Sequence, residues 1–227
     1  MSSPEVIRAA TVLPARRTVV HFQTSDGLTL IGELALPLEN QVAGALLMLH
    51  PLPTHGGMMD SHIYRKAAYR LPALADLAIF RFNTRGTESE QGKSDGEFDN
   101  GVAEKFDVQA AIDFLFAQLP HVKNVWVVGW SFGTDLALQH AKDSRVTGLI
   151  LLSPPLRTTQ ESDLEWWARD GRRVIAVVPE FDDYLTPAEA RLRFAKLSQL
   201  EMIDVANGKH LWIGEPSVQR VHNEIVK

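Results

Sequence analysis

Hydrophobic residues recur with two different periods along the chain, and these periods predict alternating strands and helices. Residues 18–24 and 28–36 are predicted as two strands that form a hairpin at Asp26-Gly27, a frequent turn sequence. The nearly continuous apolar run at residues 43–49 is typical of a strand that is buried on both faces of a sheet. Further strands are predicted at residues 78–82, 125–128, 146–152, 173–178 and 200–205.

Helical spacing occupies the segments between these strands. Residues 60–71 form one predicted helix, which Pro72 should kink or end because proline has no N–H to donate. Residues 104–119 form another, with apolar side chains along one side. Further helices are predicted to end near residue 141, to span residues 163–170, to begin with a capping box at Thr186, and to begin at Glu215-Pro216. The polar segment 83–101 is predicted to be a long loop.

This order of elements predicts the fold class. Two antiparallel strands followed by alternating strands and helices indicate an α/β protein with a mostly parallel, eight-stranded sheet. Helices would cover both faces of the sheet, and the antiparallel hairpin would lie at its N-terminal end. We find no internal repeat, low-complexity tract or linker, so residues 1–227 are expected to form a single domain.

The most informative motif is Gly129-Trp130-Ser131-Phe132-Gly133, which lies between a predicted strand and a predicted helix. In this context a G-x-S-x-G pattern presents a nucleophilic serine at the apex of a sharp turn. The two glycines have no Cβ that would clash in so tight a turn. The start of the following helix would stabilise an oxyanion. Ser131 is therefore the candidate nucleophile.

The partners of Ser131 are sought on loops at the carboxyl ends of strands, where an open parallel sheet places its functional groups. A serine hydroxyl needs a general base, which a carboxylate orients. The loop after the last predicted strand contains His210. The other histidines lie within predicted elements, at the opposite edge, or before the nucleophile. The preceding strand is followed by Asp182 and Asp183, which cannot both point at one imidazole, and Glu180 lies within range of the same strand end.

An oxyanion hole requires two backbone N–H donors. One is expected from Phe132, the residue after the nucleophile, and the other from the loop after the third strand. Pro51 and Pro53 in that loop have no N–H, so Leu52 is the candidate donor. The alternative is that this loop is only a rigid turn, whose two glycines let the backbone pass closely.

The composition of the chain limits which classes of partner and which catalytic groups are expected. Of 227 residues 45% are hydrophobic, and the net charge of −5 without a Lys or Arg run gives no expectation of a nucleic-acid partner. No apolar run approaches the roughly 20 residues that span a bilayer. Residues 1–20 lack the apolar stretch of a secretory signal. Cysteine is absent, which excludes disulfides, a thiol nucleophile and zinc sites built on thiolates. From these features together we expect a cytoplasmic protein.

With these residues the chain resembles the α/β-hydrolase superfamily over essentially its whole length. It is most similar to a compact, lidless bacterial group related to dienelactone hydrolases and to the catalytic domains of prolyl oligopeptidases. Besides the serine motif, the resemblance rests on His50-Pro51-x-Pro53 with Gly56-Gly57, on Arg81-Phe82-Asn83-x-Arg85-Gly86, and on Pro179-Glu180-x-Asp182. The last segment favours Asp182 over Asp183. Leu52 stands where an aromatic residue or histidine is often found. Dienelactone hydrolases use a cysteine nucleophile, so their activity is not implied.

The resemblance implies a serine hydrolase that cleaves small or exposed carboxylic esters through an acyl-enzyme. Ser131, His210 and Asp182 would form the triad, and no metal or organic cofactor would be required. Such enzymes insert a lid between residues 153 and 173, and here that segment is short. Its Trp166 and Trp167 line an apolar pocket or pack into the core. A peptidase for short peptides, a cofactor-free perhydrolase or lyase, and a non-catalytic binding module are the alternatives, and the oligomeric state is left open.

Overall fold

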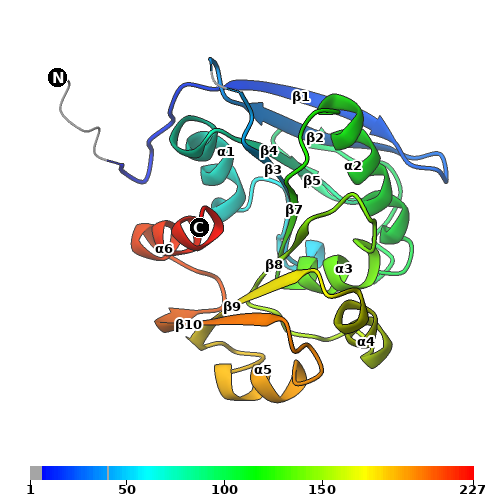
Figure 1. Cartoon of the computed structure of the whole chain (residues 1–227). Coiled ribbons are helices and arrows are strands. Elements are labelled where there is room, and N and C mark those ends of the chain that lie inside the picture. The colour runs from blue at the N-terminus through cyan, green and yellow to red at the C-terminus, as the bar shows by residue number, and fades with distance from the viewer. Residues whose placement is uncertain (1–6, 40) are drawn as a thin grey trace.

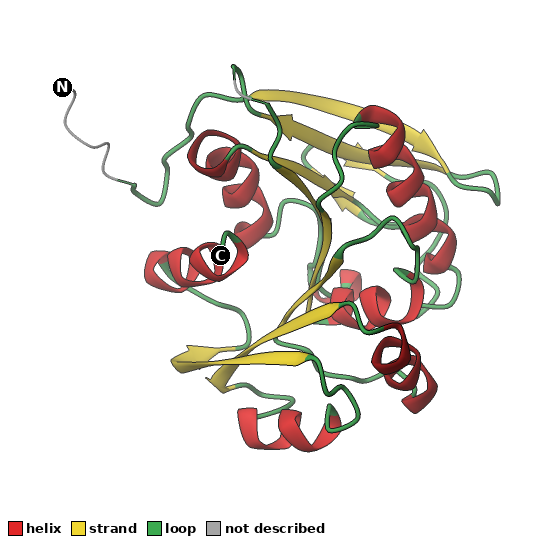
Figure 2. Cartoon of the chain, in the orientation of Figure 1, coloured by secondary structure: helices red, strands yellow, loops and turns green. Residues whose placement is uncertain are grey.

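The structure, a computed structural model, describes residues 7–39 and 41–227. Its centre is a twisted sheet of eight strands with helices on both faces (Figure 1, Figure 2). The strand order is β1-β2-β4-β3-β7-β8-β9-β10, and β2 is antiparallel to both of its neighbours while the other pairs are parallel. The strands are β1 Arg16–Gln23, β2 Thr29–Leu36, β3 Gly44–Leu49, β4 Leu77–Phe82, β7 Val125–Trp130, β8 Gly148–Leu152, β9 Arg173–Phe181 and β10 Leu200–Lys209. The predicted fold class is confirmed.

Six α-helices in the described residues divide between the two faces of the sheet (Figure 1). They are α1 His62–Ala75, α2 Glu104–Gln118, α3 Phe132–His140, α4 Glu161–Asp170, α5 Pro187–Arg193 and α6 Glu215–Ile225. Helices α1 and α6 share one apolar cluster with the sheet, and α2 to α5 share the other. Because successive strand residues point to opposite faces, Val127 contributes to one cluster and Val128 to the other.

The expected capping box of α5 is present. The Thr186 hydroxyl accepts a hydrogen bond from the Glu189 N–H at 3.5 Å, and the Glu189 carboxylate accepts one from the Thr186 N–H at 2.8 Å. These two bonds satisfy backbone donors that have no partner within the helix.

The predicted loop 83–101 is wrong in one detail, because it contains a small hairpin. Strands β5 Glu88–Ser89 and β6 Gly92–Lys93 pair with each other there. The Asn83 side chain donates to the Ser89 hydroxyl at 2.9 Å and to the Gly92 carbonyl at 3.3 Å, which ties the hairpin to the end of β4. Since side-chain bonds and not an apolar pattern stabilise this hairpin, hydrophobic periodicity could not reveal it.

Of the two outcomes expected at Pro72, a kink or the end of the helix, the second does not occur, because α1 continues to Ala75. A proline inside a helix leaves the carbonyl four residues earlier, here that of Ala68, without its helical donor. Arg17 on β1 supplies a replacement, since its Nε donates to the Ala68 carbonyl at 3.1 Å. One of its terminal nitrogens donates to the Tyr69 carbonyl at 3.1 Å and to the Leu13 carbonyl at 2.8 Å. A residue distant in sequence therefore compensates for the proline.

We expect the substitution Arg17→Met to lower the free energy of unfolding by about 2 kcal/mol, because three backbone carbonyls lose a charged donor. Urea denaturation followed by circular dichroism measures this change. The neighbouring substitution Arg16→Met removes the same charge from an exposed side chain and serves as the control. Equal effects of the two substitutions would show that Arg17 does not compensate for Pro72.

Candidate active site

Ser131 occupies a strained turn between β7 and α3. Its backbone has φ 52° and ψ −121°, a conformation that residues other than glycine rarely adopt. A Cβ at Gly133 would collide with the Leu49 carbonyl, and a Cβ at Gly129 would collide with the Gly133 carbonyl. The N–H of Ser131 donates to the Leu152 carbonyl of β8 at 2.9 Å. The two glycines thus permit the close approach that presents the serine at the end of a central strand.

The structure brings Ser131, His210 and Asp182 together in a hydrogen-bonded series. His210 Nε2 lies 2.8 Å from Ser131 Oγ, and His210 Nδ1 lies 2.9 Å from Asp182 Oδ2. The side chains of His210 and Asp182 are only 6% and 1% exposed, so little water competes for these bonds. The carboxylate must accept from Nδ1–H, which leaves Nε2 of the neutral ring free to accept the serine proton.

The three acidic candidates after β9 occupy different environments. The second oxygen of Asp182 accepts hydrogen bonds from the N–H groups of Tyr184 at 2.8 Å and Leu185 at 3.3 Å, which fixes the carboxylate toward His210. Asp183 lines the neighbouring cavity and is exposed. Glu180 accepts from the Asn207 N–H at 2.7 Å and so links the end of β9 to the end of β10. Asp182 is therefore the carboxylate that the fold places beside the imidazole.

Two residues that sequence reasoning missed hold the backbone of His210. Its carbonyl accepts from Trp130 Nε1 at 3.1 Å and from Ser153 Oγ at 3.1 Å. Ser153 is fully buried and has φ 49°. The only sequence signal for either residue is its position at the carboxyl end of a strand. Trp130 is the last residue of β7, and Ser153 directly follows β8. These donors fix the position of the histidine loop relative to the serine.

The N–H groups of Leu52 and Phe132 have no hydrogen-bond partner among the described residues. Phe132 is the first residue of α3, where the N–H groups have no helical acceptor. The Leu52 carbonyl closes the loop by accepting from His55 and Gly57 at 3.0 Å each. A Cβ at Gly57 would collide with the Pro51 carbonyl, so the backbone passes closely at this glycine, whereas a Cβ at Gly56 would meet open space.

His50 fixes the peptide group that carries the Leu52 N–H. Its Nδ1 lies 2.7 Å from the Pro51 carbonyl, which can only accept, so Nδ1 carries the proton. Nε2 then accepts from the Thr84 N–H at 3.1 Å. The ring is 1% exposed, and burial lowers the pKa of His50 to about 4. A neutral histidine thus holds the Pro51 carbonyl and, with it, the orientation of the peptide N–H of Leu52. The sequence predicts no such role for His50, which it excludes as the base because this residue precedes the serine.

A cavity of about 510 Å³ opens beside Ser131 and His210. Leu52, Phe98, Phe132, Pro155 and Leu211 supply its apolar surface. Of the two tryptophans on α4, neither lines this cavity. Trp167 is fully buried and donates to the Leu138 carbonyl at 2.9 Å, so the core alternative is the correct one for this residue.

A family model described as alpha/beta hydrolase fold matches residues 45–200. The chain belongs to this family. The matched segment includes the strand–serine–helix turn and Asp182, whereas His210 follows it.

Two solved structures support the same fold for this hydrolase, and one curated protein is similar to part of its sequence. An uncharacterized protein of Rickettsia prowazekii is 32% identical over 123 residues, which make up 54% of this chain and 50% of that protein, so the match spans about half the length of this curated relative. A serine hydrolase without a lid from Xanthomonas campestris aligns with a TM-score of 0.72 and 24% identity over 88% of both chains. A serine hydrolase homologue from Coxiella burnetii aligns with a TM-score of 0.77 and 23% identity over 92% of this chain and 95% of its own.

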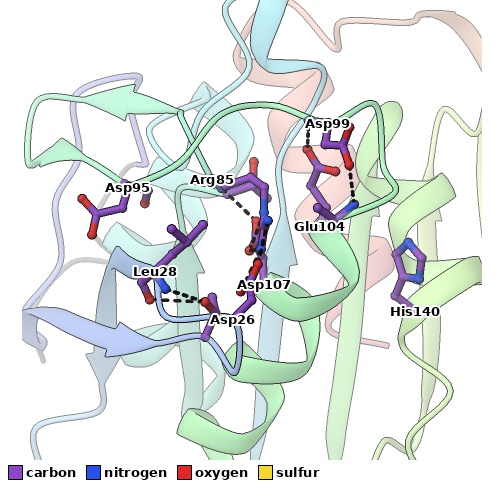
Figure 3. A network of polar contacts seen from close by, with 12 residues as sticks. Asp26, Leu28, Arg85, Asp95, Asp99, Glu104, Asp107 and His140 are labelled. Carbon is purple, nitrogen blue, oxygen red and sulfur yellow. Dashed lines mark hydrogen bonds and ion pairs between the residues drawn. The ribbon is translucent and has the colours of Figure 1, made fainter.

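Buried charges fix the loop that brings Phe98 and Asn100 to the cavity of the hydrolase. Arg85 lies between Asp107, at 2.7 Å, and Asp26, at 3.0 Å (Figure 3). Glu104, the first residue of α2, accepts from the N–H groups of Asp99 at 2.8 Å and Gly101 at 2.9 Å (Figure 3). Burial raises the pKa of Asp107, although the bonds from Arg85 oppose this effect. The buried pair of Arg85 with Asp107 and the hydrogen bonds to Glu104 thus fix the two ends of this loop.

Residues 7–39 and 41–227 contain neither a cluster of metal ligands nor a helix that could span a membrane. No three His, Asp or Glu side chains in these ranges gather in an arrangement that would hold a metal ion. None of the helices in them is long and apolar enough to cross a bilayer.

We expect the buried, neutral His50 to make stability depend on pH. Its pKa is lower in the folded chain than the value near 6.5 of an unfolded chain, so the unfolded state binds the proton first. Its contribution is complete above pH 6.5 and declines as the pH falls toward 4, by up to about 1.4 kcal/mol per pH unit. Between pH 7.5 and 5.0 the wild type should therefore lose roughly 2 kcal/mol more than His50→Asn.

Urea denaturation at the two pH values measures this difference, and the exposed His21→Asn is the matched control, which should behave as the wild type. If His50→Asn does not fold, NMR of the wild type decides instead. The ring signals of His50 should not titrate between pH 7 and 5, and a titration midpoint near 6.5 would contradict the burial argument.

Proposed function

We propose that this α/β hydrolase is a serine esterase for small or exposed carboxylic esters. The observation that carries the proposal is the hydrogen-bonded series Ser131–His210–Asp182, with the serine hydroxyl at the end of an open cavity. A nucleophile, a base and an orienting carboxylate in this order are the groups that acyl transfer requires. Ester cleavage is the simplest reaction of this kind.

In the acylation step, Ser131 Oγ attacks the ester carbonyl while His210 Nε2 accepts the serine proton. The C–O bond to the alcohol then breaks, and the imidazolium donates that proton to the leaving oxygen. Asp182 holds Nδ1–H, which keeps the ring in the correct tautomer and stabilises its positive charge. The products are a free alcohol and an acyl group on Ser131.

The negative charge of the tetrahedral intermediate requires donors that are in place before the reaction. The unpartnered N–H groups of Leu52 and Phe132 fill this role. The positive end of α3 adds to the stabilisation. His50 acts through the Pro51 carbonyl as a positioning residue, because that carbonyl and the Leu52 N–H belong to one planar peptide group.

In the deacylation step, His210 removes a proton from water, which attacks the acyl carbon. The intermediate collapses, the C–O bond to Ser131 breaks, and the histidine returns the proton to Ser131 Oγ. The carboxylic acid leaves and the starting state is restored. Every proton is transferred through one imidazole nitrogen, so the cycle needs no further co-reactant.

The preference for small or exposed esters follows from the walls of the cavity. Tyr184 and Leu211 at its edge are 47% and 51% exposed, so the cavity is open to solvent. The segment in which related enzymes carry a lid forms α4 here, and Trp167 anchors that helix in the core. No helix of the described residues therefore covers a long acyl chain.

We expect Ser131→Ala to reduce the hydrolysis of p-nitrophenyl butyrate by at least about 10³-fold while the fold stays intact, because the nucleophile is lost. A fluorophosphonate probe should label the wild type at Ser131, as peptide mass spectrometry would show. Ser144→Ala changes an exposed serine outside the cavity and should leave both readouts unchanged. Undiminished turnover by a folded Ser131→Ala protein would overturn the proposal.

Substituting Asp182 and Asp183 in turn tests which of these adjacent acids orients His210. Asp182→Asn should lower kcat by roughly 10²- to 10⁴-fold, because the amide no longer holds the required imidazole tautomer. Asp183→Asn should change kcat for a neutral ester by less than about tenfold, since this side chain does not contact His210. The measurement is kcat for p-nitrophenyl butyrate with both folded proteins. Two equal, small effects would assign the orienting role to another group.

A further inference from the structure

One charge in the cavity is not used by the triad. Arg157 lines the same cavity as Ser131, and within the described part of the chain no other Arg or Lys does so. Its guanidinium forms no ion pair or side-chain hydrogen bond with the described residues. The guanidinium lies over the ring of Tyr184, whose centre is 5.9 Å from the guanidinium carbon. A planar, permanently charged guanidinium binds a carboxylate through two parallel hydrogen bonds.

The backbone that carries Arg157 is fixed relative to the nucleophile. Asp135, one turn beyond Ser131 on α3, is 1% exposed and accepts from the N–H groups of Arg157, Thr158 and Thr159 at 3.4, 3.2 and 2.9 Å. Leu156, directly before Arg157, has φ 49° and is buried. A rigid backbone lowers the entropy that is lost when the side chain binds a ligand.

Tyr184 connects Arg157 to the catalytic base. The ring of Tyr184 lies 4.6 Å from the ring of His210, and Arg157 lies over the same tyrosine. The guanidinium is therefore one aromatic ring away from the imidazole. A substrate whose scissile carbonyl is at Ser131 would place a group several bonds away beside this cation.

Two carboxylates share the cavity with Arg157. That of Asp135 is buried and also accepts from the Thr159 hydroxyl at 2.5 Å, so donors of residues 157–159 satisfy it. Asp183 is exposed and forms no ion pair with Arg157. Its negative charge should oppose the binding of an anion. Removing this charge should therefore favour an anionic substrate, which is the opposite of the effect of removing the charge of Arg157.

We propose that Arg157 binds a carboxylate of the substrate, and that the preferred substrates are esters with a carboxylate several bonds from the scissile bond. Monoesters of short dicarboxylic acids are the acyl-side form of this chemistry, and acyl esters of hydroxybenzoates are the alcohol-side form. This inference rests on the proposed esterase function and adds the class of substrate.

The test compares kcat/KM for a charged and a neutral ester of equal length. On the acyl side the pair is 4-nitrophenyl hydrogen glutarate and 4-nitrophenyl pentanoate, and on the alcohol side it is 3-acetoxybenzoate and 3-acetoxybenzamide. In Arg157→Gln the ratio of charged to neutral ester should fall roughly tenfold in one of the two pairs, and Arg157→Lys should restore part of it. Asp183→Asn should raise the same ratio.

Arg169→Gln removes an equal charge from an exposed position on α4 outside the cavity and is the matched control. Its ratios should equal those of the wild type. An unchanged ratio for Arg157→Gln in both pairs, or an equal fall for Arg169→Gln, would overturn the inference, and the esterase function would stand.

A binding measurement separates the two proposals. Isothermal titration calorimetry of monomethyl glutarate with Ser131→Ala requires no turnover, and adding Arg157→Gln to that protein should weaken binding roughly tenfold. If the wild type hydrolyses no ester but this loss of binding is observed, the esterase function fails and the carboxylate site stands. If neither hydrolysis nor Arg157-dependent binding is found, both are wrong.

Discussion

The close approach of helix α3 to the end of strand β3 is the constraint on which the site depends. Only a residue without a side chain fits at position 133, because a Cβ there would collide with the Leu49 carbonyl. This contact sets the first turn of α3 beside the loop that starts at His50. Gly133 therefore determines how close the start of α3 lies to the loop after β3. The first of these segments carries Ser131 and the free N–H of Phe132, and the second carries the free N–H of Leu52. The cost of the serine conformation, of order 1–3 kcal/mol, is offset by the packing around it.

Buried carboxylates fix the loops at this edge of the sheet. Asp135 holds the backbone of residues 157–159, Asp182 holds the turn at Tyr184, and Glu104 holds the loop between Asp99 and Gly101. Burying an ionised carboxylate is unfavourable unless several donors compensate it. Backbone N–H groups of loops are such donors, and they would otherwise lack partners. The same bonds thus satisfy both groups and make the loops of the cavity rigid.

Periodicity and motif spacing predicted the order of the strands along the chain, the helices on both faces of the sheet, and Ser131 and His210. They left Asp182 and Asp183 open, and the family resemblance favoured Asp182. Glycine and serine spacing at 129–133 is informative because sterics allow few alternatives there. The roles of Arg17, Trp130 and Ser153 could not be predicted, since each side chain bonds to a backbone carbonyl distant in sequence. Such partners depend on the tertiary fold, and an arginine on an edge strand carries no local sign that it compensates for a proline in a neighbouring helix.

The histidines show why residue type alone does not identify a base. His50, His62, His140 and His222 each have a ring nitrogen beside a backbone carbonyl, and burial lowers the pKa of all four. A carbonyl accepts the ring N–H but adds no full charge to stabilise an imidazolium. Among the described histidines only His210 pairs with a carboxylate, and its other nitrogen faces a hydroxyl. A ring that must gain and lose a proton needs a charged partner on one side and a reacting group on the other. The fold provides this pair of partners at one position, where the ends of β9, β10 and β7 meet.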